Sequence, residues 1–168
     1  MKIYVLGVCG TFMGGLAQLA VQKGFEVAGC DENAYPPMSN VLAEQGIKVD
    51  QGFSARNIAD DIDLFVIGNV VSRGNPMMEE ILKRRLKFVS GPQFLTESIL
   101  EDRHVIAVSG THGKTSTSSM LSKVLTDAGL DIGYMIAGRA IDLDSTAYLG
   151  THKYFVIEAD EYDTAFFD

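Results

Sequence analysis

Short apolar runs alternate with segments of helical period through the first half of the chain. We expect strands at 2–8, 25–30, 47–52 and 64–69, and helices at 13–23, 38–46 and 75–85. The segments 87–90 and 92–100 continue this alternation of strand and helix. Strand–helix alternation of this kind predicts a parallel sheet covered by helices on both faces, and hence a Rossmann-like α/β domain.

The same pattern restarts after 100–104, with a strand expected at 104–109 and a helix at 115–129. Two further strands are expected at 131–138 and 154–160. We therefore place a domain boundary near 101–103, with a first domain at 1–101 and the start of a second at 102–168. No Gly/Ser-rich linker separates them, so the joint should be short and stiff. Because no helix follows the last strand, we expect the 168 residues to be the N-terminal piece of a longer protein.

The composition is that of an ordinary globular protein, since 46% of the residues are hydrophobic and 21% are charged. The net charge of −8 argues against a nucleic-acid or anionic-membrane surface, because both partners require a basic face. No apolar run is long enough to span a membrane, and the N-terminus resembles a first buried strand and not a secretory signal. Cys9 and Cys30 have no metal-ligand spacing, so we expect free thiols in a reducing cytosol.

A glycine turn that carries a lysine follows the strand at 104–109. It reads GTHGKT and is two residues shorter than the usual phosphate-loop pattern G-x-x-x-x-G-K-[ST]. A strand, a glycine turn and a helix in this order direct backbone N–H groups and the helix dipole at an anion. Lys114 would bridge the β- and γ-phosphates of a nucleotide, and the Thr115 hydroxyl would reach Mg²⁺. The alternative is an ordinary helix start, capped by Thr115 or Ser116, with Lys114 in solvent.

The strand expected at 154–160 ends in acidic residues, as the metal-binding strand beside a phosphate loop does. Glu158 and Asp160 would point to one face of this strand, and Glu161 follows them. The alternative is a solvated acidic strand end.

A second glycine turn, GVCGTFMGG, follows the first strand. The dinucleotide pattern G-x-G-x-x-G fails there, because Cys9 and Phe12 stand at two of its glycine positions. The remaining glycines still form an anion pocket that favours a nucleotide diphosphate; they are Gly7, Gly10, Gly14 and Gly15. Asp31 ends the second strand, where dinucleotide-binding proteins place a ribose-binding carboxylate. A tight turn without a ligand is the alternative.

The loop at 68–76 follows the strand at 64–69 and should bring Asn69, Arg73 and Asn75 to the same edge of the sheet. Arg73 would suit a phosphate or a carboxylate, unless it is simply an exposed loop arginine.

Together, the motifs GTHGKT, VIEADEYD and GVCGTFMGGLA resemble the Mur ligases of bacterial peptidoglycan metabolism. The resemblance covers essentially the whole chain and implies a UDP-sugar domain at 1–101 and the beginning of a P-loop-type ATP-binding domain at 102–168. YPPMS, NVVSRGNP, SGPQFL and EADEYDTAFFD are similar to the recycling member of the family. That member attaches the tripeptide L-alanyl-γ-D-glutamyl-meso-diaminopimelate to UDP-N-acetylmuramate. The alternative within the family is the ligase that attaches L-alanine.

The resemblance implies ATP and Mg²⁺ as cofactors, with Lys114 as the catalytic residue on the transferred phosphoryl group. It places the ATP phosphates against Gly110, Thr111, His112, Gly113, Lys114, Thr115 and Ser116, and Mg²⁺ on Thr115 and Glu158. It places the UDP-sugar against Gly7, Gly10, Thr11, Phe12, Met13, Gly14, Asp31, Asn69 and Arg73. In this picture Gly10–Met13 lie along the diphosphate, and Asp31 and Asn69 lie near the uridine.

The family mechanism implies that the γ-phosphoryl of ATP passes to the lactyl carboxylate of UDP-N-acetylmuramate, and that the peptide amine attacks the resulting acyl phosphate. The family's later histidine, carbamylated lysine, adenine-binding residues and peptide-binding domain have no place within the 168 residues. We therefore expect the chain alone to bind the UDP-sugar weakly or moderately, to bind ATP poorly, and not to ligate. The resemblance implies a cytoplasmic enzyme with no obligate protein partner. Two rival functions are a non-catalytic Rossmann-like nucleotide sensor and a phosphotransferase with an ordinary P-loop.

Overall fold

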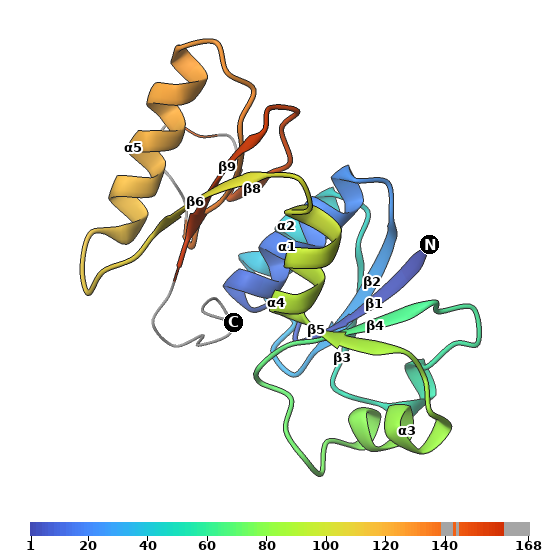
Figure 1. Ribbon diagram of the computed structural model, residues 1–168. Helices are drawn as coiled ribbons and strands as arrows, with labels where there is room; N and C mark the ends of the chain where they lie inside the picture. Colours follow the sequence, from blue (N-terminus) through green and yellow to red (C-terminus); the bar gives the residue numbers. More distant parts are fainter. Residues whose placement is uncertain (139–142, 144, 160–168) are drawn as a thin grey trace. The chain divides into compact units, whose positions relative to one another are not determined.

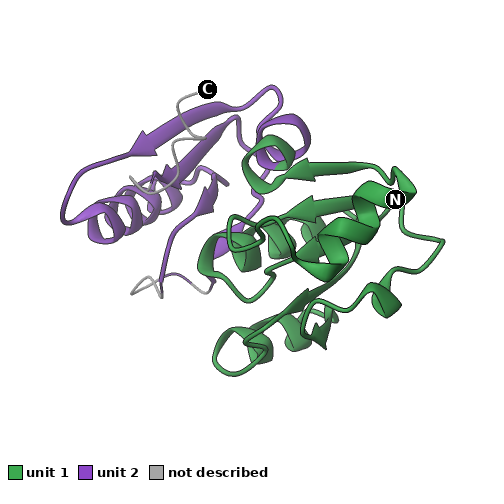
Figure 2. Cartoon of the chain, turned by 90° about the horizontal axis from the view of Figure 1, so that it is seen from below, with its two compact units in different colours: residues 1–94 green, residues 95–168 purple. Residues whose placement is uncertain are grey.

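The computed structural model describes residues 1–138, 143 and 145–159. The chain divides into two compact units, Met1–Phe94 and Leu95–Asp168 (Figure 2). The sequence led us to expect the boundary somewhat later, near 101–103. The second unit begins with Leu95–Ile99, a π-helical turn, η2, after which the N–H of Leu100 donates to the carbonyl of Leu95.

The first unit contains a five-stranded sheet in the order β3-β2-β1-β4-β5 (Figure 1). Its strands are β1 (Lys2–Leu6), β2 (Glu26–Asp31), β3 (Lys48–Gln51), β4 (Leu64–Ile67) and β5 (Phe88–Ser90). All four pairings are parallel, which confirms the parallel α/β sheet predicted for this part of the chain. The chain winds from β1 outward to β3 and then returns to β4 on the other side of β1. Ligands of such sheets bind at the carboxyl ends of the strands beside this reversal, which here are the ends of β1 and β4.

Helices cover both faces of this sheet. They are α1 (Thr11–Gln22), α2 (Met38–Glu44), α3 (Pro76–Arg84) and α4 (Gly91–Phe94), with a 3₁₀ turn, η1, at Ala55–Asn57. Figure 1 shows α3 on the side of the sheet opposite to α1, α2 and α4. Tyr4 and Leu6 alternate onto one face of β1 and lie in one buried cluster with Met77 and Ile81 of α3. The core is therefore two-layered around a buried β1, as the near-continuous apolar run at 2–8 requires.

The second unit has a four-stranded sheet in the order β6-β9-β7-β8. The strands are β6 (His104–Val108), β7 (Gly133–Met135), β8 (Ala147–Tyr148) and β9 (Tyr154–Glu158), and the helix is α5 (Lys114–Asp127). β9 pairs in parallel with β6 and β7, whereas β8 runs antiparallel to β7. Leu121 and Leu125 of α5 pack against the buried Tyr134 and Val156 on one face of this sheet. We did not predict β8, because two residues are too few to reveal a strand period.

Candidate functional site

The GTHGKT loop of the second unit lies between β6 and α5, at the carboxyl end of the sheet. Residues 109–113 of this loop are all exposed. Gly110 and Gly113 have φ angles of 148° and 77°, and Gly113 is the residue that precedes the first turn of α5. Both angles lie in the region that only glycine adopts readily, so the two glycines determine the shape of the loop. α5 therefore begins at Lys114, with its first N–H groups at the loop.

The first two residues of α5 carry the side chains expected to act on a nucleotide. Lys114 Nζ donates to the carbonyl of Gly110 at 2.7 Å, so the lysine folds back across the loop. Thr115 Oγ1 donates to Glu158 Oε1 at 2.9 Å. The structure thus brings together three predicted residues, Lys114, Thr115 and Glu158. The capping alternative for Thr115 is not what is seen, because its hydroxyl reaches β9 and no side chain caps α5.

Strand pairing explains why Glu158 reaches the loop. β6 and β9 are neighbours, Glu158 lies opposite Val108, and the N–H of Ala159 donates to the carbonyl of Val108 at 3.0 Å. The carboxylate has a second partner, because Ala137 N donates to Oε2 at 2.9 Å. Ala137 follows β7, so the carboxylate at the end of β9 links the first turn of α5 to the segment after β7. We did not predict this contact, since a backbone donor leaves no signature in the residue type.

The donor set at this point suits Mg²⁺. A threonine hydroxyl and a glutamate oxygen are hard ligands, and Mg²⁺ commonly takes one or two protein oxygens together with phosphate and water. Within residues 1–138, 143 and 145–159, no group of three or more His, Cys, Asp or Glu gathers as a metal site. The predicted acidic residues Asp160 and Glu161, and the rest of the EADEYDTAFFD motif after Ala159, lie outside the described residues.

The other predicted residues of the loop are accessible. Thr111 and His112 are exposed on the loop itself, and Ser116 is exposed in the first turn of α5. The hydroxyl groups further along α5 serve the helix, because Ser118 and Ser119 donate to the carbonyls of Lys114 and Thr115, both at 2.6 Å. The exposed side chains therefore line the mouth of the loop, while the buried ones hold the start of α5.

The first glycine turn, at 7–10, connects β1 to α1 in the first unit. Gly7 N and Val8 N both donate to the carbonyl of Cys30, at 2.8 and 3.2 Å, and Gly10 N donates to the carbonyl of Gly7 at 3.1 Å. These N–H groups face the protein, so the turn does not direct them outward as an anion pocket. The predicted contact residues Thr11, Phe12, Met13 and Gly14 form the first turn of α1, where the helix dipole favours an anion.

Asp31 lies at the end of β2 and is only 8% exposed. Its Oδ2 accepts from Cys9 N and its Oδ1 accepts from Asn33 N, both at 2.9 Å. Both carboxylate oxygens therefore hold backbone groups, one of them in the glycine turn.

The loop after β4 reaches the same edge of the sheet. Asn69 and Arg73 are exposed there, as a ligand-binding role would need. Val70 is 65% exposed and lies next to the turn, since a Cβ on Gly7 would come within 2.8 Å of Val70 Cγ2. Asn75 has a structural task, because its Oδ1 accepts from Met77 N and Met78 N at the start of α3.

The two cysteines are free thiols, as expected. Burial, together with the nearby negative charge of Asp31, raises the pKa of the Cys9 thiol to about 11. Burial raises the pKa of Cys30 to about 12. Both thiols are therefore protonated at neutral pH and are poor nucleophiles.

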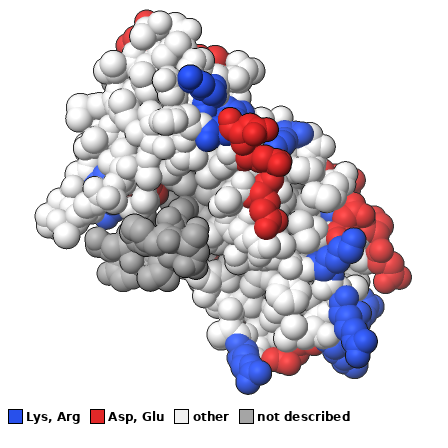
Figure 3. All heavy atoms as spheres, viewed as in Figure 1, with Lys and Arg blue, Asp and Glu red and all other residues white. Residues whose placement is uncertain are grey.

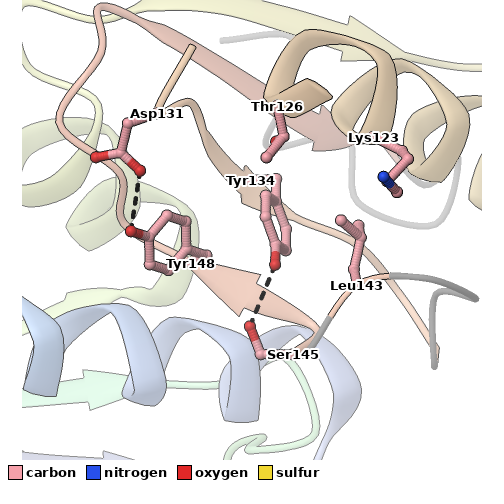
Figure 4. Close-up of a pocket in the computed structure, with 7 residues that line it drawn as sticks. All are labelled: Lys123, Thr126, Asp131, Tyr134, Leu143, Ser145 and Tyr148. Carbon is pink, nitrogen blue, oxygen red and sulfur yellow. Dashed lines mark hydrogen bonds between the residues drawn. The ribbon is translucent and has the colours of Figure 1, made fainter. Parts of the chain in front are cut away.

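A cavity of about 390 Å³ in the second unit is lined by none of the residues of the GTHGKT loop (Figure 4). Its lining comes from the last turns of α5 and from the segment around β7 and β8, with Lys123, Thr126, Asp131, Tyr134, Leu143, Ser145 and Tyr148. Tyr148 OH donates to Asp131 Oδ1 at 2.9 Å, and Tyr134 OH lies 3.4 Å from Ser145 Oγ. None of the predicted site residues lines this cavity, so it is separate from the chemistry of the loop.

Side chains of both charge signs lie on the surface. On the face shown in Figure 3, Lys and Arg lie among Asp and Glu and do not merge into one basic surface. Within the part of the chain that the structure describes, no helix has the length and apolar character needed to cross a membrane.

A family model described as "Mur ligase family, catalytic domain" matches residues 2–103. The chain belongs to the Mur ligase family. This confirms the resemblance drawn from the glycine motifs. The matched span includes the first unit from Lys2 to Phe94, with its sheet and first glycine turn.

Individual Mur ligases match over the full chain. The UDP-N-acetylmuramate–L-alanyl-γ-D-glutamyl-meso-2,6-diaminoheptandioate ligase of Escherichia coli (strain K12) is 51% identical over 168 residues, which is 100% of this chain and 37% of that protein. The crystal structure of the corresponding ligase from Neisseria meningitides matches with a TM-score of 0.93 and 48% identity, over 99% of this chain and 55% of that chain. The chain spans 37% of the length of the curated relatives it matches.

A more distant Mur ligase shares the fold. The UDP-N-acetylmuramate-alanine ligase of Thermotoga maritima matches with a TM-score of 0.85 at 23% identity, over 94% of this chain and 37% of that chain.

Proposed function

We propose that the protein containing this chain is an ATP-dependent ligase of peptidoglycan recycling, which joins L-alanyl-γ-D-glutamyl-meso-diaminopimelate to UDP-N-acetylmuramate. The proposal rests chiefly on the Thr115–Glu158 pair beside Lys114, a hydroxyl and a carboxylate held 2.9 Å apart at the mouth of a glycine loop. The identity of 51% over the whole chain to a ligase named for this tripeptide supports the choice of substrate. The same proposal places the enzyme in the cytoplasm, where ATP and UDP-sugars are available.

In the second unit, the exposed loop would hold the phosphates of ATP. Gly110 to Ser116 would surround them, and Lys114 would leave the carbonyl of Gly110 to bind the transferred phosphoryl group. Thr115 and Glu158 would hold Mg²⁺, which would neutralise phosphate charge when bound. Catalysis of phosphoryl transfer consists mainly of positioning and charge neutralisation, and these residues supply both.

In the first unit, the start of α1 would hold the diphosphate of the UDP-sugar. Gly7 and Gly10 give the turn its shape, and Thr11 to Gly14 begin the helix whose dipole favours the anion. Asn69 and Arg73 extend from the neighbouring strand end and would contact the sugar nucleotide. These assignments follow from position at the carboxyl edge of the sheet, where such folds bind nucleotides.

The decisive variant is Lys114→Ala, assayed in a protein that contains this chain and is as long as the curated relatives. We expect ligation of the tripeptide to fall by at least about a thousandfold, because a charged contact made to the transferred group is lost. Binding of UDP-N-acetylmuramate, measured by calorimetry, should be unchanged. Lys123→Ala is the matched control, since it removes another lysine of α5, one paired with Asp127 in the last turn of the helix. Ligation that survives Lys114→Ala would contradict the assignment of the loop.

The second candidate is the alanine-adding reaction of the same family. An assay that offers UDP-N-acetylmuramate and ATP with either L-alanine or the tripeptide separates the two. Faster phosphate release with the tripeptide supports the proposal, and preference for L-alanine would overturn it.

A further inference from the structure

Both carboxylate oxygens of Asp31 already accept a hydrogen bond from the backbone of the first unit. The carboxylate accepts from Cys9 N in the glycine turn and from Asn33 N just after β2, both at 2.9 Å, and only 8% of the residue is exposed. In dinucleotide-binding proteins the acidic residue at this position accepts instead from the hydroxyls of the ribose. A ribose would have to reach the same two oxygens, which the backbone bonds hold in a residue that is largely buried.

We propose that Asp31 is a positioning residue of the nucleotide site, which holds the glycine turn in place through the N–H of Cys9 and does not touch the ribose. This rests on the proposed function of the first unit. Turning the carboxylate toward a ribose would leave the part-buried N–H of Cys9 without its acceptor, and an unsatisfied buried donor is costly. Two of the other N–H groups of the turn donate to the carbonyl of Cys30 in β2, and Gly10 N donates to the carbonyl of Gly7. Asp31 therefore supplies the one side-chain acceptor among the four.

Two consequences follow for the ligand. The diphosphate meets the start of α1 at Thr11, because the N–H groups of the turn face inward. A dinucleotide such as NAD gains nothing from Asp31, so the unit favours a nucleoside diphosphate that is held by its phosphates.

The test compares Asp31→Ala with Glu32→Ala in the 168-residue chain, with UDP as the probe and NMR titration of first-unit amides as the readout. Each variant removes one negative charge, and the side chain of Glu32 is exposed. Charge alone would make both variants bind the anionic UDP slightly more tightly. Positioning predicts the opposite for Asp31→Ala, a loss of about tenfold, because the turn and the start of α1 lose their fixed geometry. Equal binding by the two variants would overturn the proposal.

A second ligand separates positioning from ribose contact. The same titrations use 2′,3′-dideoxyuridine 5′-diphosphate, which lacks both ribose hydroxyls. Positioning predicts that Asp31→Ala weakens UDP and the dideoxy compound by the same factor. A loss seen with UDP and absent with the dideoxy compound would show direct contact and refute the proposal.

A measurement on the unaltered chain guards against a variant that does not fold. Hydrogen exchange of the Cys9 and Asn33 amides should stay slow when UDP is bound, because Asp31 keeps both bonds. Faster exchange on binding would mean that the carboxylate swings away and would refute the proposal. If UDP does not bind the first unit at all, the proposed function of that unit fails. Asp31→Asn without ligand still decides whether Asp31 holds the turn, since unchanged exchange at both amides would show that it does not.

Discussion

Glu158 should support both the stability of the second unit and the proposed binding of Mg²⁺, and two substitutions separate these contributions. Glu158→Ala removes the acceptor for Thr115 Oγ1 and for Ala137 N. Glu158→Gln keeps the shape of the side chain, since the amide oxygen can accept from Ala137 N and the amide NH₂ can donate to the threonine hydroxyl. Only the negative charge is lost in the second variant.

The magnitude follows from the partners left behind. The hydroxyl of Thr115 can rotate toward water, so losing its hydrogen bond to Glu158 costs little. Ala137 N is a fixed, part-buried donor, and leaving such a group unpaired costs about 1–3 kcal/mol. We expect Glu158→Ala to reduce the free energy of unfolding of the second unit by about 2 kcal/mol, and Glu158→Gln by less than about 1 kcal/mol. Binding of Mg²⁺ with nucleotide should be lost in both variants, because a neutral amide is a weak ligand for a hard cation.

Hydrogen exchange resolves the two units separately, which a single melting curve does not do for a chain of this kind. Amides of α5 and β9 that exchange only through unfolding of the second unit should lose about 30-fold of their protection in Glu158→Ala. Glu101→Ala is the matched control, since it removes an exposed glutamate of the same unit. Equal protection in the alanine and glutamine variants would refute the reasoning, and so would full Mg²⁺-dependent nucleotide binding in Glu158→Gln.

Two further predictions concern the second unit. Gly113→Ala should reduce the free energy of unfolding by about 1 kcal/mol, because alanine is strained at a φ of 77°. Crowding adds nothing, since no atom lies within 4 Å of the new Cβ. Gly133→Ala should reduce the free energy of unfolding by about 3 kcal/mol through crowding, since its Cβ would lie 2.3 Å from a ring carbon of Phe155. Hydrogen exchange measures both free energies, and equal reductions in the two variants would contradict both predictions. Hydrogen bonds from Thr151 and, to a lesser extent, from Tyr148 lower the pKa of Asp131. These bonds stabilise the folded second unit fully at a pH above the ordinary pKa of aspartate, and the stabilisation is lost as the pH falls through the lowered pKa of the folded state. In ¹³C NMR titrations, Thr151→Val should raise the pKa of Asp131 more than Tyr148→Phe does, and an unchanged pKa in both would contradict the cause given.

The elements with a clear period were predictable from the sequence, and the contacts across the sheets were not. The apolar run at 2–8 and the helical spacing of 13–23 led directly to β1 and α1. β8 could not be predicted, because a strand of two residues shows no hydrophobic period and its antiparallel pairing depends on β7.

The candidate site was predictable in residue type but not in arrangement. The motif GTHGKT identified Lys114 and Thr115, and an acidic strand end identified Glu158. That Glu158 reaches Thr115 depends on β9 lying beside β6, a strand order that sequence spacing does not determine. The hydrogen bonds from Cys9 N and Ala137 N could not be predicted for a different reason, since any residue except proline offers the same N–H.

These two backbone contacts point to one common principle in the two units. In each, a carboxylate at the end of a parallel strand accepts from the N–H of a loop that follows the neighbouring strand. Asp31 of β2 holds Cys9 after β1, and Glu158 of β9 holds Ala137 after β7. The second oxygen distinguishes them, because that of Asp31 holds another backbone N–H whereas that of Glu158 holds a hydroxyl that can turn toward a cation. Substituting Asp31 should therefore change only the shape of its site, whereas substituting Glu158 should change both shape and metal affinity.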